Sequence, residues 1–120
     1  MRAATSYQRG MASEETAALF LERQGYRILR RRFKTSVGEV DIIARDGESL
    51  VFVEVKFRQE MDAALETLSE KQRNRLFAAA EVFLSLEEDP SLARLPMRFD
   101  VIAMTPTAIQ HLKNAFWKEE

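Results

Sequence analysis

The chain has 120 residues, of which 46% are hydrophobic, 31% are charged and none is cysteine, and its formal net charge is −1. These values are typical of a globular protein and exclude a disordered chain, so we expect a single domain over residues 1–120. The lack of cysteine excludes disulfides and thiolate metal sites and is compatible with a reducing cytoplasm, where we expect the protein. No apolar run is long enough for a membrane span or a signal peptide, so we expect no membrane partner.

Charge is unevenly distributed along the chain. Residues 1–58 contain 11 Lys and Arg against 8 Asp and Glu, whereas residues 59–120 contain 7 against 11. A net charge near zero argues against a strongly basic nucleic-acid-binding surface over the whole protein. The excess of positive charge in the first half becomes larger if some of its acids hold a cation.

The first half of the chain predicts a helix followed by three strands. Residues 1–11 are expected to be loosely ordered, and Ser13 is a suitable N-cap for a helix that runs to about residue 24. Gly25 suits the end of that helix, and residues 26–34 form the first expected strand, which ends in a basic run. Residues 38–58 then predict two adjacent strands joined by a tight turn at Asp46-Gly47.

The second half predicts a long helix and a further strand. Residues 62–68 fit either a short helical turn or a loop. Ser69 and Gln72 form a capping-box pattern that opens a helix of about 18 residues, and Asp89-Pro90 ends it. Residues 97–104 alternate as a strand, while the spacing of apolar residues in 108–117 favours a short helix. The order α-β-β-β-α-β favours a mixed sheet flanked by helices.

Charged side chains interrupt the two most apolar strands at matching positions. Glu54 and Lys56 lie on one face of the second hairpin strand, and Asp41 lies on the neighbouring strand. Two carboxylates at about 4–5 Å and an effective dielectric constant near 20 repel by on the order of 3–4 kcal/mol. A divalent cation offsets that repulsion, and carboxylate oxygens suit Mg²⁺ or Mn²⁺.

These residues stand in a pattern that resembles the bacterial YraN family, within the restriction-endonuclease-like PD-(D/E)xK superfamily. The matching segments are Ser13-Glu14-x-x-Ala17-x-x-Phe20-Leu21-x-x-x-Gly25-Tyr26, Gly38-Glu-Val-Asp-Ile-Ile43, Val51-Phe-Val-Glu-Val-Lys56-x-Arg58, Lys71-Gln72 and Arg98-Phe-Asp-Val101. They cover roughly residues 10 to 117. Ser13 replaces a glycine of the family pattern, and Arg32 stands where the family often has Asn. The implied fold is a restriction-endonuclease-like α/β core with the order αβββαβ.

The resemblance implies a metal-dependent nuclease site. Asp41 and Glu54 are expected to bind Mg²⁺ or Mn²⁺ together with the backbone carbonyl of Val55. Glu14 is expected to approach from the first helix, as a similar glutamate does in archaeal Holliday-junction resolvases, which share this layout. Lys56 is expected to orient or deprotonate the attacking water, or to stabilise charge on the scissile phosphate. Glu39 shares the face of Asp41 and is expected to support the site or to bind the metal.

A second set of residues could bind the nucleic-acid backbone. Its members are the basic run of the first strand and the arginine beside Lys56: Arg30, Arg31, Arg32, Lys34 and Arg58. Each neutralised phosphate adds salt-dependent affinity, and an arginine can bind a phosphate through two hydrogen bonds. DNA, including branched or structured DNA, is the expected partner, and a homodimer is expected by analogy because two cuts in a branched substrate need two centres.

Other interpretations of the same residues remain open. The acids and Lys56 could form a structural salt-bridge cluster, or the domain could be a degenerate nuclease fold that binds nucleic acid without cleaving it. Glu14 could be only an acid in the first turn of a helix, and the basic run could protect an edge strand from aggregation. A protein-interaction domain that binds no nucleic acid is a third possibility. The lone His111 is not expected to bind a metal.

Overall fold

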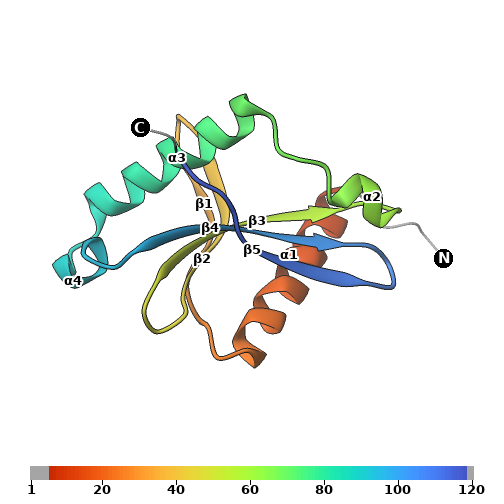
Figure 1. Ribbon diagram of the computed structural model, residues 1–120, viewed down its shortest axis with the longest axis horizontal. Helices are drawn as coiled ribbons and strands as arrows, with labels where there is room; N and C mark the ends of the chain where they lie inside the picture. The colour runs from red at the N-terminus through yellow and green to blue at the C-terminus, as the bar shows by residue number, and fades with distance from the viewer. Residues whose placement is uncertain (1–5, 119–120) are drawn as a thin grey trace.

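The computed structural model describes the backbone of residues 6–118 and the side chains of residues 12–118. A five-stranded mixed sheet forms the centre, with α1 and α3 on opposite sides of it (Figure 1). The elements are α1 (Ser6–Arg23), β1 (Arg27–Lys34), β2 (Glu39–Arg45), β3 (Leu50–Phe57), α2 (Met61–Ala64), α3 (Glu70–Leu86), α4 (Pro90–Ala93), β4 (Met97–Met104) and β5 (Ile109–Phe116). This arrangement confirms the predicted α/β class and is compatible with a restriction-endonuclease-like core.

The strands lie in the order β1-β2-β3-β4-β5, so each pairs with its neighbours in the chain. All pairs are antiparallel except β3 with β4, which is parallel because α2, α3 and α4 return the chain to the same end of the sheet. Parallel neighbours need a crossover connection of this kind. β3 therefore lies in the middle of the sheet, and the residues of the Glu54–Lys56 motif lie on its most enclosed strand.

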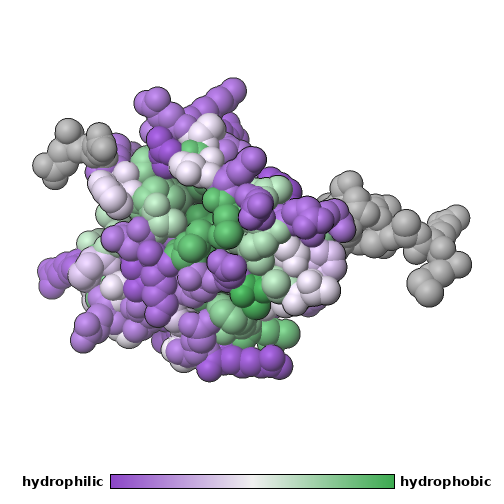
Figure 2. Space-filling view, turned by 45° about the vertical axis from the view of Figure 1, so that its right-hand side comes forward, coloured by the Kyte–Doolittle hydropathy of each residue, from purple (hydrophilic) through white to green (hydrophobic). Residues whose placement is uncertain are grey.

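Two hydrophobic clusters fill the space above and below the sheet. Leu50 and Phe52 of β3 pack on the α3 side, whereas Val51 and Val53 pack on the α1 side. Alternate residues of one strand thus enter different clusters, which explains why β3 is apolar at every position from Leu50 to Val53. On the face seen in Figure 2, hydrophobic residues gather in the middle, between hydrophilic residues above and below.

Two local predictions are confirmed by backbone geometry. Ser69 accepts a hydrogen bond from the amide of Gln72 at 3.1 Å, and the Gln72 side chain accepts one from the amide of Ser69 at 3.0 Å. This is the capping box that opens α3. The hairpin turn has a φ of +91° at Gly47, a backbone conformation that favours glycine.

The beginning of α1 differs from the prediction. The helix begins at Ser6, so Ser13 is not its N-cap and Glu14 does not lie in its first turn. Residues 6–11, which we expected to be loosely ordered, are helical; residues 1–5 lie outside the described residues. The segment contains Gln8, Arg9 and Met11, which favour helix, and only Gly10 strongly opposes it. Glu14 is therefore an interior helix residue. The favourable interaction of an acid with a helix N-terminus does not explain why a glutamate occupies this position.

The end of the chain is a strand rather than the short helix that its spacing favoured. β5 pairs antiparallel with β4, with a register shift between Phe99 and Val101 of β4 and a φ of +52° at Asn114. Ile109 packs with the cluster on the α1 side, and Leu112 packs with the cluster on the α3 side. Apolar residues three apart fit this strand because both faces of the sheet are covered.

The connection from β3 to β4 contains two short helices. Residues 62–68, which fitted either a helical turn or a loop, include the end of α2. Asp89 and Pro90 do not end α3, which stops at Leu86, but begin α4: Asp89 caps it and Pro90 is its first residue. Proline favours that position because its missing N–H has no partner in the first turn. No helix within residues 6–118 is long and apolar enough to cross a membrane.

Candidate functional site

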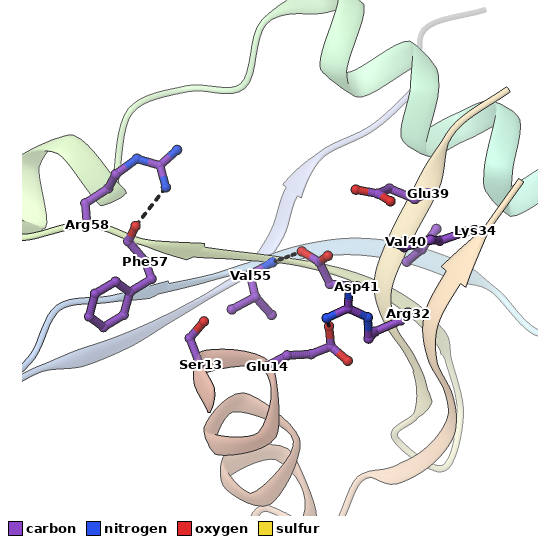
Figure 3. A pocket seen from close by; sticks show the side chains of 10 residues that line it. All are labelled: Ser13, Glu14, Arg32, Lys34, Glu39, Val40, Asp41, Val55, Phe57 and Arg58. Carbon is purple, nitrogen blue, oxygen red and sulfur yellow. Dashed lines mark hydrogen bonds and ion pairs between the residues drawn. The ribbon is translucent and has the colours of Figure 1, made fainter. Parts of the chain in front are cut away.

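The site begins where β2 and β3 stop pairing. The pairing of these strands ends at Ile42 with Val53, and the next side chain of β2, Asp41, accepts a hydrogen bond from the backbone amide of Val55 at 2.8 Å. The regular alternation of β2 is also interrupted at Asp41. Val40 packs on the α3 side of the sheet and Ile42 on the α1 side, although residues two apart in a strand normally share a face. The Asp41 carboxylate thus takes the place of a backbone acceptor in the sheet (Figure 3).

Asp41 and Glu54 contact each other through their side chains, as their positions on neighbouring strands predicted. Burial, followed by the charge of Asp41 and the hydrogen bond to it, raises the pKa of Glu54 from 4.5 to about 8. Burial also raises the pKa of Asp41, despite the hydrogen bond from Val55. Because its pKa is about 8, Glu54 holds near neutral pH a proton that an ordinary glutamate would have lost.

Glu14 reaches the same place from α1. Its side chain is buried, with only 4% of the residue exposed, and burial and the charge of Asp41 raise its pKa. Ion pairs join it to the guanidinium groups of Arg31 at 3.5 Å and Arg32 at 3.8 Å. Among the residues that the structure describes, the Oε1 atom of Glu14 nevertheless has no hydrogen-bond partner. The structure therefore brings a third carboxylate toward the Asp41–Glu54 pair and balances it with two arginines.

A cleft of about 510 Å³ opens over these groups (Figure 3). Three acidic side chains, three basic side chains and four uncharged ones line it. The complete lining is Ser13, Glu14, Arg32, Lys34, Glu39, Val40, Asp41, Val55, Phe57 and Arg58. Lys34 and Arg32 come from the edge strand β1, and Arg58 follows β3 on the other side of Asp41. Glu14 and Asp41 are the enclosed acids of the lining, whereas Glu39 is exposed, as are Lys34 and Arg58. Enclosed acids with cations around them suit a ligand that carries phosphate groups around a bound cation.

Some of the predicted site residues do not line the cleft. Lys56 is 7% exposed, and its amine donates a hydrogen bond to the backbone carbonyl of Glu66, between α2 and α3. Burial and the nearby charge of Arg58 lower the pKa of Lys56. Glu54 contacts Asp41 but is not part of the lining. Arg30 is exposed, and its guanidinium bonds the carbonyl of its own neighbour Leu29.

The chemistry of the acidic side chains suits a hard divalent cation. Asp41, Glu54 and Glu14 offer only oxygen ligands, and the buried Oε1 atom of Glu14 meets no hydrogen-bond donor within the described part of the chain. Within the described part of the chain, no three acidic or histidine side chains already converge as a metal cage. A cation at Asp41 and Glu54 would therefore take a further ligand from Glu14, after a change in its ion pairs, or from a backbone carbonyl.

A second buried polar group was not identified from the sequence. Asp100 is fully buried and accepts hydrogen bonds from Arg98 at 2.9 and 3.0 Å and from the Asn114 amide at 2.8 Å. The Nε2 atom of His111 lies 2.7 Å from it. Burial alone would raise the pKa of Asp100, but these partners hold it below its usual value. The only sequence signal is a charged pair, Arg98 and Asp100, within the otherwise apolar strand β4.

Arg98 extends this network to two other elements. Its guanidinium also contacts Asp46 in the hairpin turn at 2.7 Å and the hydroxyl of Tyr26 after α1 at 2.7 Å. The group joins the segment after α1, the hairpin turn, β4 and β5. Because Arg98 is bonded to both Asp46 and Asp100, and only the Nδ1 atom of His111 lacks a hydrogen-bond partner among the described residues, we assign the group a structural role.

Comparisons with known proteins agree on one family. The family model described as "Uncharacterised protein family UPF0102" matches residues 13–104, a span that contains Glu14, Asp41, Glu54 and Lys56. A UPF0102 protein of Azorhizobium caulinodans is 47% identical over 116 residues, covering 96% of this chain and 87% of the relative. UPF0102 proteins of Rhodopseudomonas palustris and Mesorhizobium japonicum are 45% and 44% identical, covering 92% and 93% of this chain and 85% and 89% of their own.

Proposed function

The chain belongs to the UPF0102 family, whose name states no activity, and from the site itself we propose that it is a Mg²⁺-dependent nuclease that hydrolyses phosphodiester bonds in DNA, including branched or structured DNA. One observation carries this proposal. Asp41 and Glu54 form a half-buried carboxyl pair with raised pKa values beside a cleft that three basic side chains line. Such a pair costs stability, and perturbed acids in a cleft are typical of functional sites.

Four groups would hold the cation. They are the carboxylates of Asp41 and Glu54, the backbone carbonyl of Val55 and, from α1, Glu14. A bound Mg²⁺ would supply electrostatic stabilisation of a phosphate and activation of water. To hold a cation, Asp41 and Glu54 would both have to be deprotonated, so the pair would release its proton.

The cationic side chains at the rim would bind and orient the DNA backbone. Arg32 and Lys34 lie on one side of Asp41 and Arg58 on the other, so a chain of phosphates can cross the cleft between them. Arg58 already uses part of its guanidinium on the carbonyl of Phe57 at 2.8 Å, which fixes the position of the side chain. Arg30 lies outside the cleft and would contribute at most to the wider basic edge.

Lys56 would exchange a proton close to the acidic pair. It follows Glu54 by two residues on β3, and its lowered pKa favours release of a proton compared with an ordinary lysine. To orient water or to meet a phosphate, its amine has to leave the Glu66 carbonyl. The proposed reaction therefore includes a rearrangement of Lys56 toward the cleft.

The test is cleavage of duplex, single-stranded and four-way DNA in the presence of Mg²⁺ or Mn²⁺. We expect wild-type protein to cleave at least one of them and Asp41→Asn to lose more than about 100-fold of that activity, because it removes a direct ligand. Glu48→Gln is the matched control, since it neutralises an exposed acid in the hairpin loop. The nuclease proposal is refuted if wild type and Asp41→Asn are equally active, or if the wild type cleaves none of the substrates.

A non-catalytic nucleic-acid-binding module is the second candidate. The position of Lys56, bonded to the Glu66 carbonyl outside the cleft lining, favours it. This function predicts DNA binding without cleavage, with an affinity that falls as salt rises. Lys34→Gln combined with Arg58→Gln should then reduce the slope of log affinity against log salt by about 0.9 for each lost phosphate contact on duplex DNA. An unchanged slope would remove these residues from the interface.

A further inference from the structure

Glu14 is the point at which the basic edge strand and the acidic pair meet. Arg31 Nε lies 3.5 Å from one of its carboxylate oxygens, and a terminal nitrogen of Arg32 lies 3.8 Å from the other. The Glu14 side chain is 6% exposed, whereas those of Arg31 and Arg32 are 37% and 29% exposed. The two guanidinium groups thus cover a buried acid and remain accessible to a ligand in solution.

The backbone of β1 is distorted where these two arginines lie. Successive side chains of a strand normally point to opposite faces, so neighbouring residues of β1 would not both reach one carboxylate. Arg32 has a φ of +53°, in the left-handed region that non-glycine residues rarely adopt. This conformation accompanies the contact of both arginines with Glu14. A disfavoured conformation of this kind is often found at functional sites.

We propose that Arg31 and Arg32 couple DNA binding to cation binding by exchanging Glu14 for a backbone phosphate of the DNA. The inference rests on the proposed function, since it concerns the ligands of the same site. In the exchanged state the two guanidinium groups hold phosphate, and the carboxylate of Glu14 turns to the cation held by Asp41 and Glu54. Arg31 and Arg32 are positioning residues in this scheme, because they act on the cation through Glu14.

The contacts of Glu14 suit such an exchange. Distances of 3.5 and 3.8 Å are longer than the roughly 2.7–2.9 Å of a strong charge-assisted hydrogen bond. The Oε1 atom has no hydrogen-bond partner among the side chains of residues 12–118 and the backbone described, so the arginines do not satisfy the carboxylate fully. A phosphate that binds the arginines and a cation that binds Glu14 each have to break the ion pairs between Glu14 and the two arginines. Once the first ligand has broken them, the second binds without that cost. The two ligands therefore favour each other, and the effect must be reciprocal.

The experiment measures DNA affinity with and without the cation, without relying on cleavage. A fluorescent single-stranded DNA with phosphorothioate linkages, which resist hydrolysis, is titrated with protein at constant ionic strength, with EDTA or with saturating Mn²⁺. We expect Mn²⁺ to tighten binding to the wild type by at least about fivefold, the lower end of ordinary coupling. In the double variant Arg31→Gln, Arg32→Asn the ratio should fall to about one. Asn is chosen at position 32 because it tolerates a positive φ.

Two further variants make the result specific. Arg30→Gln removes the same charge from the same strand but not from Glu14, so it should keep the ratio of the wild type. Glu14→Gln releases both arginines, so DNA should bind more tightly in EDTA than it does to the wild type, and Mn²⁺ should add little. This second outcome also tests the inference if the double variant does not fold.

The outcomes separate this inference from the proposed function. A double variant with the ratio of the wild type, or a Glu14→Gln variant with weakened DNA binding in EDTA, overturns the exchange and leaves the nuclease proposal standing. A wild type that binds DNA equally well with and without Mn²⁺ also overturns the exchange. If neither Mn²⁺ nor DNA binds, the proposed function is refuted and the exchange with it.

Discussion

Replacement of Glu54 by glutamine should stabilise the protein at alkaline pH. In the folded protein the pKa of Glu54 is raised from 4.5 to about 8, mainly by burial and then by Asp41. The folded protein therefore holds a proton that the unfolded chain releases above about pH 4.5. Wild-type stability should fall as the pH rises from about 4.5 to about 8 and then level off. Glutamine carries no such proton, and its amide can donate to Asp41.

The magnitude follows from the size of the pKa shift. One pKa unit corresponds to about 1.4 kcal/mol, so the raised pKa of Glu54 represents on the order of 3–5 kcal/mol of lost stability above pH 8. The free energy of unfolding of Glu54→Gln should exceed that of the wild type by an amount in this range at about pH 9. At about pH 4.5 the two proteins should be nearly equal, because protonated Glu54 resembles glutamine.

Urea denaturation between about pH 4.5 and pH 9, in EDTA, measures this difference. Glu48→Gln is again the matched control and should follow the wild-type curve. Added Mg²⁺ should raise the stability of the wild type, by about 2.7 kcal/mol at a hundredfold excess over Kd, and should help Glu54→Gln much less. A difference between wild type and Glu54→Gln that does not change with pH, or a variant less stable at pH 9, would show that the carboxyl pair is not strained.

Three further changes test the fold around the site. Asp100→Asn should lower the free energy of unfolding by about 3–5 kcal/mol, because it leaves buried donors without their carboxylate. Lys118→Gln, at an exposed ion pair, is the control and should change that free energy by less than about 1 kcal/mol. Similar effects of the two variants in urea denaturation would contradict this. Gly38→Ala should cost at least about 1–3 kcal/mol, because the added carbon would lie 2.0 Å from the Arg75 carbonyl oxygen, and an unchanged melting curve would refute that contact. Ser69→Ala should cost about 1 kcal/mol by removing the cap of α3, with no effect expected if the capping box is absent.

Local patterns predicted the central parts of the fold. The strand character of β3, the glycine turn before it and the capping box of α3 depend on residues close together in the sequence. The contact between Asp41 and Glu54 could be predicted because a hairpin places neighbouring strands side by side. The same reasoning failed for the last strand, since apolar residues of β5 serve two clusters that only a sheet covered on both faces provides.

By itself, the sequence determined the class of the fold and which acids meet on adjacent strands, because strand periodicity and turn chemistry act over a few residues. Only the tertiary structure decided that Lys56 bonds Glu66 rather than lining the cleft, that Arg31 and Arg32 hold Glu14, and that Asp100 is buried among partners on β4 and β5. Apart from the bonds between Arg98 and Asp100, each of these contacts joins residues at least ten positions apart. Their geometry depends on how helices pack on the sheet and on one distorted residue in β1, and no local pattern contains that information.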